Sequence, residues 1–339
     1  MNNTKQLKAA VIGLGVGAHQ ARTLSAHTNS KLVWICDFDK KILTKIGSEL
    51  KEAKQTQNAK DVLLDPDIDL VCIASYDEAH YGQVLEALNH GKHVYVEKPI
   101  CMTKIEAQKI HSKLRENPKL HLSSNMVLRT CPLFNKLKQK INSNKMGSIY
   151  FYEADYFYGR KEKLVSGWRA DAKLYSIIYG AAVHMIDLIM WVTEKKPLRV
   201  HALGNGISTA GTRQKNNDFA VLMLEFEDNM IVKISAHGGC VHPHFHSLKV
   251  FGTNSSFIHE ITGTVWLETS DPNQELKKED EEYPAKMKRN NALISFLDSL
   301  IKFDKISMVS KEEIFDVMSV CFAAEEAVQT GKIVEIKYL

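Results

Sequence analysis

The hydrophobic pattern changes character along the chain. Over the first third, short apolar runs at residues 9–12, 31–36, 69–75, 93–96 and 120–124 alternate with stretches of helical periodicity at 18–27, 78–89 and 103–115. Near-continuous apolar runs are typical of parallel strands that are covered on both faces. Alternating strands and helices of these lengths predict an open parallel sheet with helices on both sides, ending near residue 123.

Beyond residue 125, strands follow one another in place of this alternation. Helices are predicted at 132–141 and 177–192, and two more, at about 287–302 and 310–329, close the chain. Strands are predicted at 148–158, 198–203, 219–226, 230–236, 246–251, 256–260 and 264–268. This order indicates an α+β domain with a large, open and mostly antiparallel sheet. We therefore predict an α/β domain over residues 1–123 and an α+β domain over residues 124–339.

Composition narrows the class of protein. Of the 339 residues, 44% are hydrophobic and 25% are charged, and a net charge of +4 gives no case for nucleic acid or a membrane surface as partner. The six cysteines form no C-x-x-C pair, which favours reduced thiols in the cytoplasm. Residues 1–8 lack the apolar core of a signal peptide, and the apolar stretch 177–192 contains His184 and Asp187, so no membrane span is expected.

A glycine-rich turn follows the first predicted strand. Gly13, Gly15 and Gly17 lie between that strand and a predicted helix, a geometry that places a pyrophosphate against the N-terminus of the helix. The spacing reads G-x-G-x-G-A, so Ala18 takes the third position of the usual pattern. A tight turn without a ligand is the alternative explanation.

Asp37 ends the second predicted strand, 20 residues beyond Gly17. A dinucleotide-binding domain places there the carboxylate that hydrogen-bonds the ribose hydroxyl. No arginine follows directly, and a carboxylate repels a 2′-phosphate, so we expect NAD rather than NADP as cofactor. The alternative is that Asp37 caps the next helix, a role for which Asp39 competes.

Further polar residues lie at strand ends and on an apolar helix, where they are candidates for binding or catalysis. Ser75 and Lys98 end later strands of the parallel sheet, and Lys98 is a candidate proton relay unless it is a surface lysine at a turn. His184 and Asp187 share one face of an apolar helix, either as a satisfied buried pair or as a pair facing the site. His242, His244 and His246 alternate, but Pro243 interrupts them and no fourth ligand is evident, so no metal is expected.

These residues together resemble the Gfo/Idh/MocA oxidoreductases. The glycine turn, Asp37, the run Glu97-Lys98-Pro99 and His184-x-x-Asp187 carry the resemblance, which extends over nearly the whole chain. It implies an N-terminal Rossmann domain that binds NAD or NADP, and a second domain that binds a sugar, cyclitol or nucleotide sugar and makes the contacts of a homodimer or homotetramer.

The resemblance also implies roles for individual residues. Lys98 and His184 would be catalytic, and Asp187 would bind substrate. Arg169, with Arg160, Lys161, Lys163 and Lys173, is a candidate for meeting a substrate phosphate or carboxylate, unless this segment is a solvated loop. The expected cofactor-binding residues are Gly13, Gly15, Gly17, Ala18, Asp37, Ser75, His80, Glu97 and Lys98.

One position departs from the family pattern. Many members carry Asp four residues before the histidine, where this chain has Gly180. Either His184 and Lys98 suffice, or Tyr179 or another group substitutes and contacts the substrate, or activity is changed or lost. The leading expectation is an NAD-dependent dehydrogenase that moves a hydride between nicotinamide and a ring carbinol. The alternatives are a non-redox enzyme that oxidises its substrate transiently and a catalytically silent dinucleotide-binding sensor.

Overall fold

A computed structural model describes residues 6–172, 174–302 and 304–339. The chain forms two compact units. The first comprises residues 1–127, 287–315 and 339, and the second residues 128–286 and 316–338, so the segment 287–315 joins the first unit rather than the second, where the sequence had placed it. Lys173, one of the candidate anion-binding residues, lies outside the described residues.

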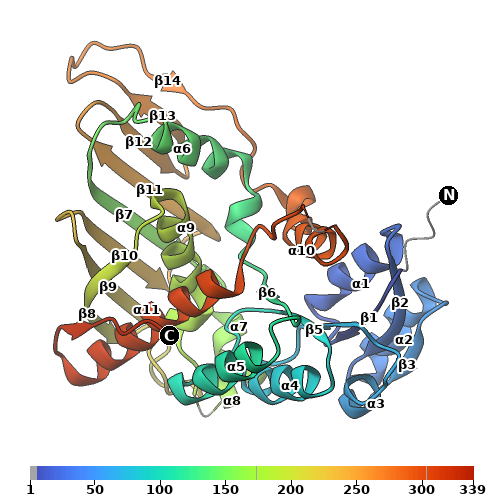
Figure 1. Cartoon of the computed structure of the whole chain (residues 1–339). Coiled ribbons are helices and arrows are strands. Elements are labelled where there is room, and N and C mark those ends of the chain that lie inside the picture. The colour runs from blue at the N-terminus through green and yellow to red at the C-terminus, as the bar shows by residue number, and fades with distance from the viewer. Residues whose placement is uncertain (1–5, 173, 303) are drawn as a thin grey trace. The chain divides into compact units, whose positions relative to one another are not determined.

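The first unit contains a six-stranded parallel sheet (Figure 1). In the sheet the order is β3-β2-β1-β4-β5-β6, so the direction of strand succession reverses between β1 and β4, the place where such sheets bind dinucleotides. Ile12 pairs with Cys36 and with Ile73, so these strands end at one edge of the sheet. The strands are β1 (Leu7–Ile12), β2 (Ser30–Cys36), β3 (Lys54–Thr56), β4 (Leu70–Ile73), β5 (His93–Val96) and β6 (Leu122–Ser124).

Helices cover this sheet. Leu293, Phe296 and Leu297 of α10 share a buried core with α1, α2 and the sheet, which is why the C-terminal segment belongs to this unit. The predicted capping box of α5 is confirmed, with Thr103 and Glu106 satisfying each other's backbone N–H groups. The helices are α1 (Gly17–Ala26), α2 (Lys40–Glu49), α3 (Ala59–Leu63), α4 (Asp77–Asn89), α5 (Lys104–Glu116) and α10 (Asn291–Ile301).

The second unit is built on a nine-stranded sheet of order β14-β13-β12-β11-β7-β10-β9-β8-β15. Only β10 and β7 pair in parallel, so the predicted mostly antiparallel sheet is confirmed. The strands are β7 (Ile149–Phe157), β8 (Pro197–Asn205), β9 (Phe219–Phe226), β10 (Ile231–His237), β11 (Phe245–Gly252), β12 (Ser256–Glu260), β13 (Gly263–Leu267), β14 (Lys277–Lys278) and β15 (Val334–Glu335).

Helices of the second unit pack on one face of that sheet. In Figure 1, α6 and α9 lie side by side over β7. The helix predicted at 177–192 begins as a π-helical turn, η2 (Ile178–Ala182), before α9 continues it. The remaining elements are η1 (Val127–Thr130), α6 (Pro132–Asn142), α7 (Glu162–Val165), α8 (Trp168–Asp171), α9 (Val183–Thr193), η3 (Lys286–Lys288) and α11 (Lys311–Thr330). The boundary between the two units falls within α11, between residues 315 and 316.

Within the described residues, no helix combines the length and the apolar character that crossing a bilayer requires.

Candidate functional site

The glycine turn brings β1, α1 and the end of β4 into close contact. Gly13 has φ +87°, and a Cβ at this position would lie 2.3 Å from the Ala74 carbonyl oxygen, so only glycine fits. A Cβ on Gly17 would lie 3.0 Å from side-chain atoms of both Val11 and Ala74. Close packing of helix on strand therefore rests on Gly17, although the motif spacing had given that position to Ala18, which is buried beside it.

The N-terminus of α1 fits an anion. A Cβ on Gly15 would meet no atom within 4 Å, so space is left above the turn. Helices α2, α3 and α5 are capped by the side chains of Asp39, Asn58 and Thr103, whereas the N-cap of α1 is Val16 and its first turn has no acidic residue. Uncapped N–H groups and the positive end of the helix dipole are the features that bind a pyrophosphate.

Asp37 lies beside this turn. Its Oδ2 accepts a hydrogen bond from the Leu14 N–H at 2.7 Å, and its Oδ1 accepts one from the Asp39 N–H at 2.8 Å. Asp39 itself caps α2, which excludes the alternative that Asp37 is the cap. Each carboxylate oxygen can accept a second hydrogen bond, so Asp37 fits a ribose hydroxyl.

His80 joins two loops at the edge of the sheet. Its Nδ1 lies 2.6 Å from the Pro99 carbonyl oxygen and its Nε2 lies 3.1 Å from that of Ser75, and the side chain is 0% exposed. With both ring nitrogens facing backbone carbonyls, this placement argues against the expected contact with cofactor. His80 instead ties the end of β4 to the turn that carries Lys98. The Ser75 hydroxyl donates to Gln83 Oε1 at 2.7 Å.

Lys98 follows β5 and is half-buried, and its peptide bond to Pro99 is cis. The neighbouring Glu97 accepts hydrogen bonds through Oε1 from Gln20 Nε2 and Asn125 Nδ2, each at 2.9 Å. Burial raises the pKa of Glu97, while the Asn125 hydrogen bond and the Lys98 charge act in the opposite direction. Asn125 was missed from the sequence, although its position directly after a strand of the same sheet is the signal that singled out Lys98.

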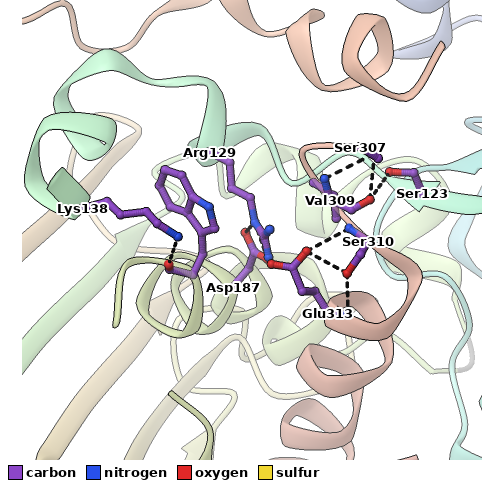
Figure 2. Close-up of polar contacts among 9 residues, drawn as sticks. Ser123, Arg129, Lys138, Asp187, Ser307, Val309, Ser310 and Glu313 are labelled. Carbon is purple, nitrogen blue, oxygen red and sulfur yellow. Dashed lines mark hydrogen bonds and ion pairs between the residues drawn. The ribbon is translucent and has the colours of Figure 1, made fainter. Parts of the chain in front are cut away.

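Asp187 forms a buried ion pair with Arg129 (Figure 2). Arg129 Nε lies 3.1 Å from both carboxylate oxygens and Nη2 donates to Oδ1 at 2.7 Å, and both side chains are 1% exposed. This burial argues against the expected direct contact of Asp187 with substrate. It gives the carboxylate a positioning role one turn after His184, on helix α9.

An aromatic cluster surrounds His184. The Tyr156 ring stacks on the His184 imidazole with centroids 5.8 Å apart and an interplanar angle of 9°. The Tyr156 ring also meets two further histidine rings edge-on, with centroid distances of 4.6 Å to His246 and 5.4 Å to His244. His242 stacks on Phe157 instead, at 4.2 Å. The three alternate histidines therefore do not share one face, because Pro243 and the loop geometry separate His242 from the others.

His246 has a hydrogen-bond partner of its own within the cluster. Burial lowers the pKa of His246 to about 3, so its ring is neutral near pH 7, and its Nδ1 lies 2.6 Å from the Tyr283 hydroxyl. Across the described ranges, no group of three or more His, Cys, Asp or Glu side chains is arranged to hold a metal ion.

Tyr179 and Arg169 are the two remaining candidates for substrate binding. The Tyr179 ring packs edge-on against Phe322, with centroids 6.0 Å apart. The Arg169 guanidinium lies 4.4 Å from the Trp168 ring centre, and its Nε is buried.

We expect Asp187→Asn to lower the free energy of unfolding by about 3 kcal/mol, because it removes the charge that pairs with a buried guanidinium. Urea unfolding followed by circular dichroism measures this loss. The matched double variant Arg129→Met with Asp187→Leu should recover most of it, since apolar side chains of similar volume replace both charges. An Asp187→Asn protein as stable as the wild type would contradict this role.

Comparison with known proteins agrees with this geometry. The model of the oxidoreductase family with an NAD-binding Rossmann fold, GFO/IDH/MocA, matches residues 7–125, and the model of the GFO/IDH/MocA C-terminal domain matches residues 134–258. Inositol 2-dehydrogenase of Salmonella typhimurium is 23% identical over 231 residues, 67% of each chain. The scyllo-inositol 2-dehydrogenase (NAD(+)) of Bacillus subtilis is 24% identical over 258 residues, 75% of this chain and 73% of the relative.

A solved structure shares the fold over almost the full length. Scyllo-inositol dehydrogenase from Lactobacillus casei, with bound NAD(H) and scyllo-inositol, superposes with a TM-score of 0.77 at 20% identity, covering 98% of this chain and 99% of that one. The order of the parallel strands, the glycine turn and the two matched domains lead to one assignment: the chain belongs to the GFO/IDH/MocA oxidoreductase family, with an N-terminal NAD-binding Rossmann domain.

Proposed function

We propose that this protein is an NAD-dependent dehydrogenase that oxidises a ring carbinol of a cyclitol, sugar or nucleotide sugar. The observation that carries the proposal is the uncapped N-terminus of α1, with Asp37 beside it and Lys98 ending a nearby strand of the same sheet. The inositol dehydrogenases among its relatives support a cyclitol as the first substrate to test.

In this proposal, residues of the first unit bind the cofactor. Backbone N–H groups at Gly15, Gly17 and Ala18 meet the pyrophosphate, and Gly13 permits the turn that presents them. Asp37 accepts a hydrogen bond from a ribose hydroxyl, and its charge disfavours a 2′-phosphate. Ser75, Glu97 and Lys98, at the ends of β4 and β5, complete the nicotinamide side.

Oxidation of a carbinol releases a hydride and a proton. Bound NAD supplies the hydride acceptor. We assign the proton to His184, aided by Lys98, because an imidazole changes its charge near neutral pH and an ammonium group can orient the hydroxyl. The neutral His246 and the stacked Tyr156 are two uncharged neighbours of the His184 ring.

We expect Lys98→Ala to lower kcat by about 10²- to 10⁴-fold, because it removes a positioned proton-transfer group. The assay is formation of reduced nicotinamide from NAD with myo- or scyllo-inositol. Lys104→Ala, which changes an exposed lysine at the start of α5, is the control and should keep the wild-type rate. An undiminished rate in Lys98→Ala would contradict the assigned role, and wild-type protein that binds NAD but reduces none with any polyol would favour a sensor.

The wild type should bind NAD at least about tenfold more tightly than NADP, equivalent to ~1.4 kcal/mol, because Asp37 repels the 2′-phosphate. Isothermal titration with each cofactor measures the ratio. Asp37→Ser should reduce the preference by weakening NAD and strengthening NADP. Equal affinities in the wild type would count against the ribose role of Asp37.

We further propose a homodimer or homotetramer formed through the sheet face opposite α9. Leu203, Met223 and Ile231 share that face by strand register and are 57%, 38% and 43% exposed. Light scattering after size-exclusion chromatography should give the mass of two or four chains, and Met223→Glu with Leu203→Glu should shift it toward one. A wild-type mass of one chain would refute the assembly.

A cytoplasmic setting is also proposed. Its support is the state of the six cysteines, all within the described residues, which are free thiols, five of them buried.

A further inference from the structure

Gly180 has no side chain, but the space that a side chain would occupy there is filled by another residue. A Cβ on Gly180 would lie 2.5 Å from the Tyr175 hydroxyl oxygen and 3.1 Å from Tyr175 Cζ. The phenol of Tyr175 therefore places a polar group where a side chain at position 180 would begin. Residues 180 and 184 are four apart, so this hydroxyl lies on the same helical face as His184, about one turn before it.

Neighbouring contacts hold Tyr175 in this place. Its side chain is 5% exposed and meets the Trp168 ring edge-on at 6.2 Å, with the Arg169 guanidinium 5.9 Å from the ring centre. The adjacent Ser176 fixes the backbone, because its hydroxyl oxygen accepts from the N–H groups of Ile178 at 3.0 Å and Tyr179 at 3.2 Å. The same hydroxyl donates to Glu325, so the start of the π-helical turn is tied to α11.

Tyr175 also belongs to the surroundings of His184. Burial raises the pKa of Tyr156, and interaction with Tyr158 and with Tyr175 raises it further, so the hydroxyls of Tyr156 and Tyr175 are electrostatic neighbours. Tyr156 stacks on the His184 ring. The hydroxyl beside Gly180 therefore interacts electrostatically with a residue that stacks on His184.

We infer that Tyr175 is a substrate-orienting residue whose hydroxyl serves in place of a side chain at position 180, hydrogen-bonding the polyol beside the group that His184 deprotonates. This role rests on the proposed function. A phenol both donates and accepts one hydrogen bond without carrying charge, which suits a neutral hydroxyl partner. Position 180 can then be only glycine, since any Cβ would displace the Tyr175 hydroxyl.

The first test is Tyr175→Phe, assayed with myo- and scyllo-inositol. We expect the KM for the polyol to rise and kcat/KM to fall at least about tenfold, the equivalent of one hydrogen bond. The dissociation constant for NAD should not change. The control is Tyr152→Phe, which removes a hydroxyl that is buried in the same unit and, within the described residues, has no hydrogen-bond partner; it should keep wild-type kinetics.

The second test separates the hydroxyl from the fold. Gly180→Ala adds a Cβ that pushes the hydroxyl aside without removing it, so it should reproduce the loss seen in Tyr175→Phe. The double variant should be no worse than Gly180→Ala alone, because both changes remove one interaction. Gly180→Asp should impair the enzyme. Additive losses, or a Gly180→Asp protein faster than the wild type, would overturn the inference.

The two proposals fail in different ways. Wild-type protein that binds inositol in the presence of NADH but never turns it over would refute the dehydrogenase function, and Tyr175→Phe should still weaken that binding about tenfold by calorimetry. Normal turnover with wild-type kinetics in Tyr175→Phe would refute only the role of Tyr175. Absence of any inositol binding by the wild type would refute both.

Discussion

The buried ion pair between Arg129 and Asp187 fixes the part of the second unit on which the chemistry depends. Two charges that are 1% exposed need compensation for their burial, and contacts of 2.7–3.1 Å between them provide it. The pair holds η1 against α9, the helix that carries His184. Other bonds reinforce the arrangement. Lys138 of α6 donates to the Trp191 carbonyl oxygen at 2.7 Å (Figure 2). Asn135 donates to the Arg129 carbonyl oxygen at 2.9 Å. The position of His184 is therefore set by its helix and by the buried ion pair one turn further along it.

The first unit depends on a different constraint, which is close backbone approach. Gly13 and Gly17 let α1 start directly over the ends of β1 and β4, and Asp37 holds the Leu14 N–H from the side. His80 then links the loops after β4 and β5, so the turn bearing Lys98 is anchored to the strand beside the glycine turn. Rigid loops at one sheet edge reduce the conformational cost of binding a long, flexible cofactor.

Local signals predicted much of this structure. Strands of the parallel sheet follow from their apolar runs, and the cap of α5 follows from the spacing of Thr103 and Glu106. Polar partners that are distant in sequence were not predictable: the substrate role expected of Asp187 came from the family resemblance, and nothing local indicates its partner Arg129, which is 58 residues away. The same limit applies to His80, whose partners are carbonyl groups of two loops. The segment 287–315 was assigned to the second domain because helical periodicity does not reveal which core a helix joins.

Position 180 shows how the two kinds of information combine. The sequence lacks the usual Asp at this position, and Tyr179 or another group was one of the alternatives that it left open. The π-helical turn carries Tyr179 toward Phe322 and leaves room beside Gly180 for the Tyr175 hydroxyl. The space of the missing side chain is thus occupied by a residue five positions earlier in the chain, which only the folded geometry reveals.

The central claim is that this protein transfers a hydride from a ring carbinol to nicotinamide. The most direct measurement is the fate of deuterium when the wild type is incubated with NAD and an inositol deuterated at its carbinol carbons. Proton NMR of the recovered cofactor should show deuterium at C4 of the reduced nicotinamide, on one face only. Reduced cofactor without deuterium, or no reduced cofactor while inositol is bound, would contradict the claim.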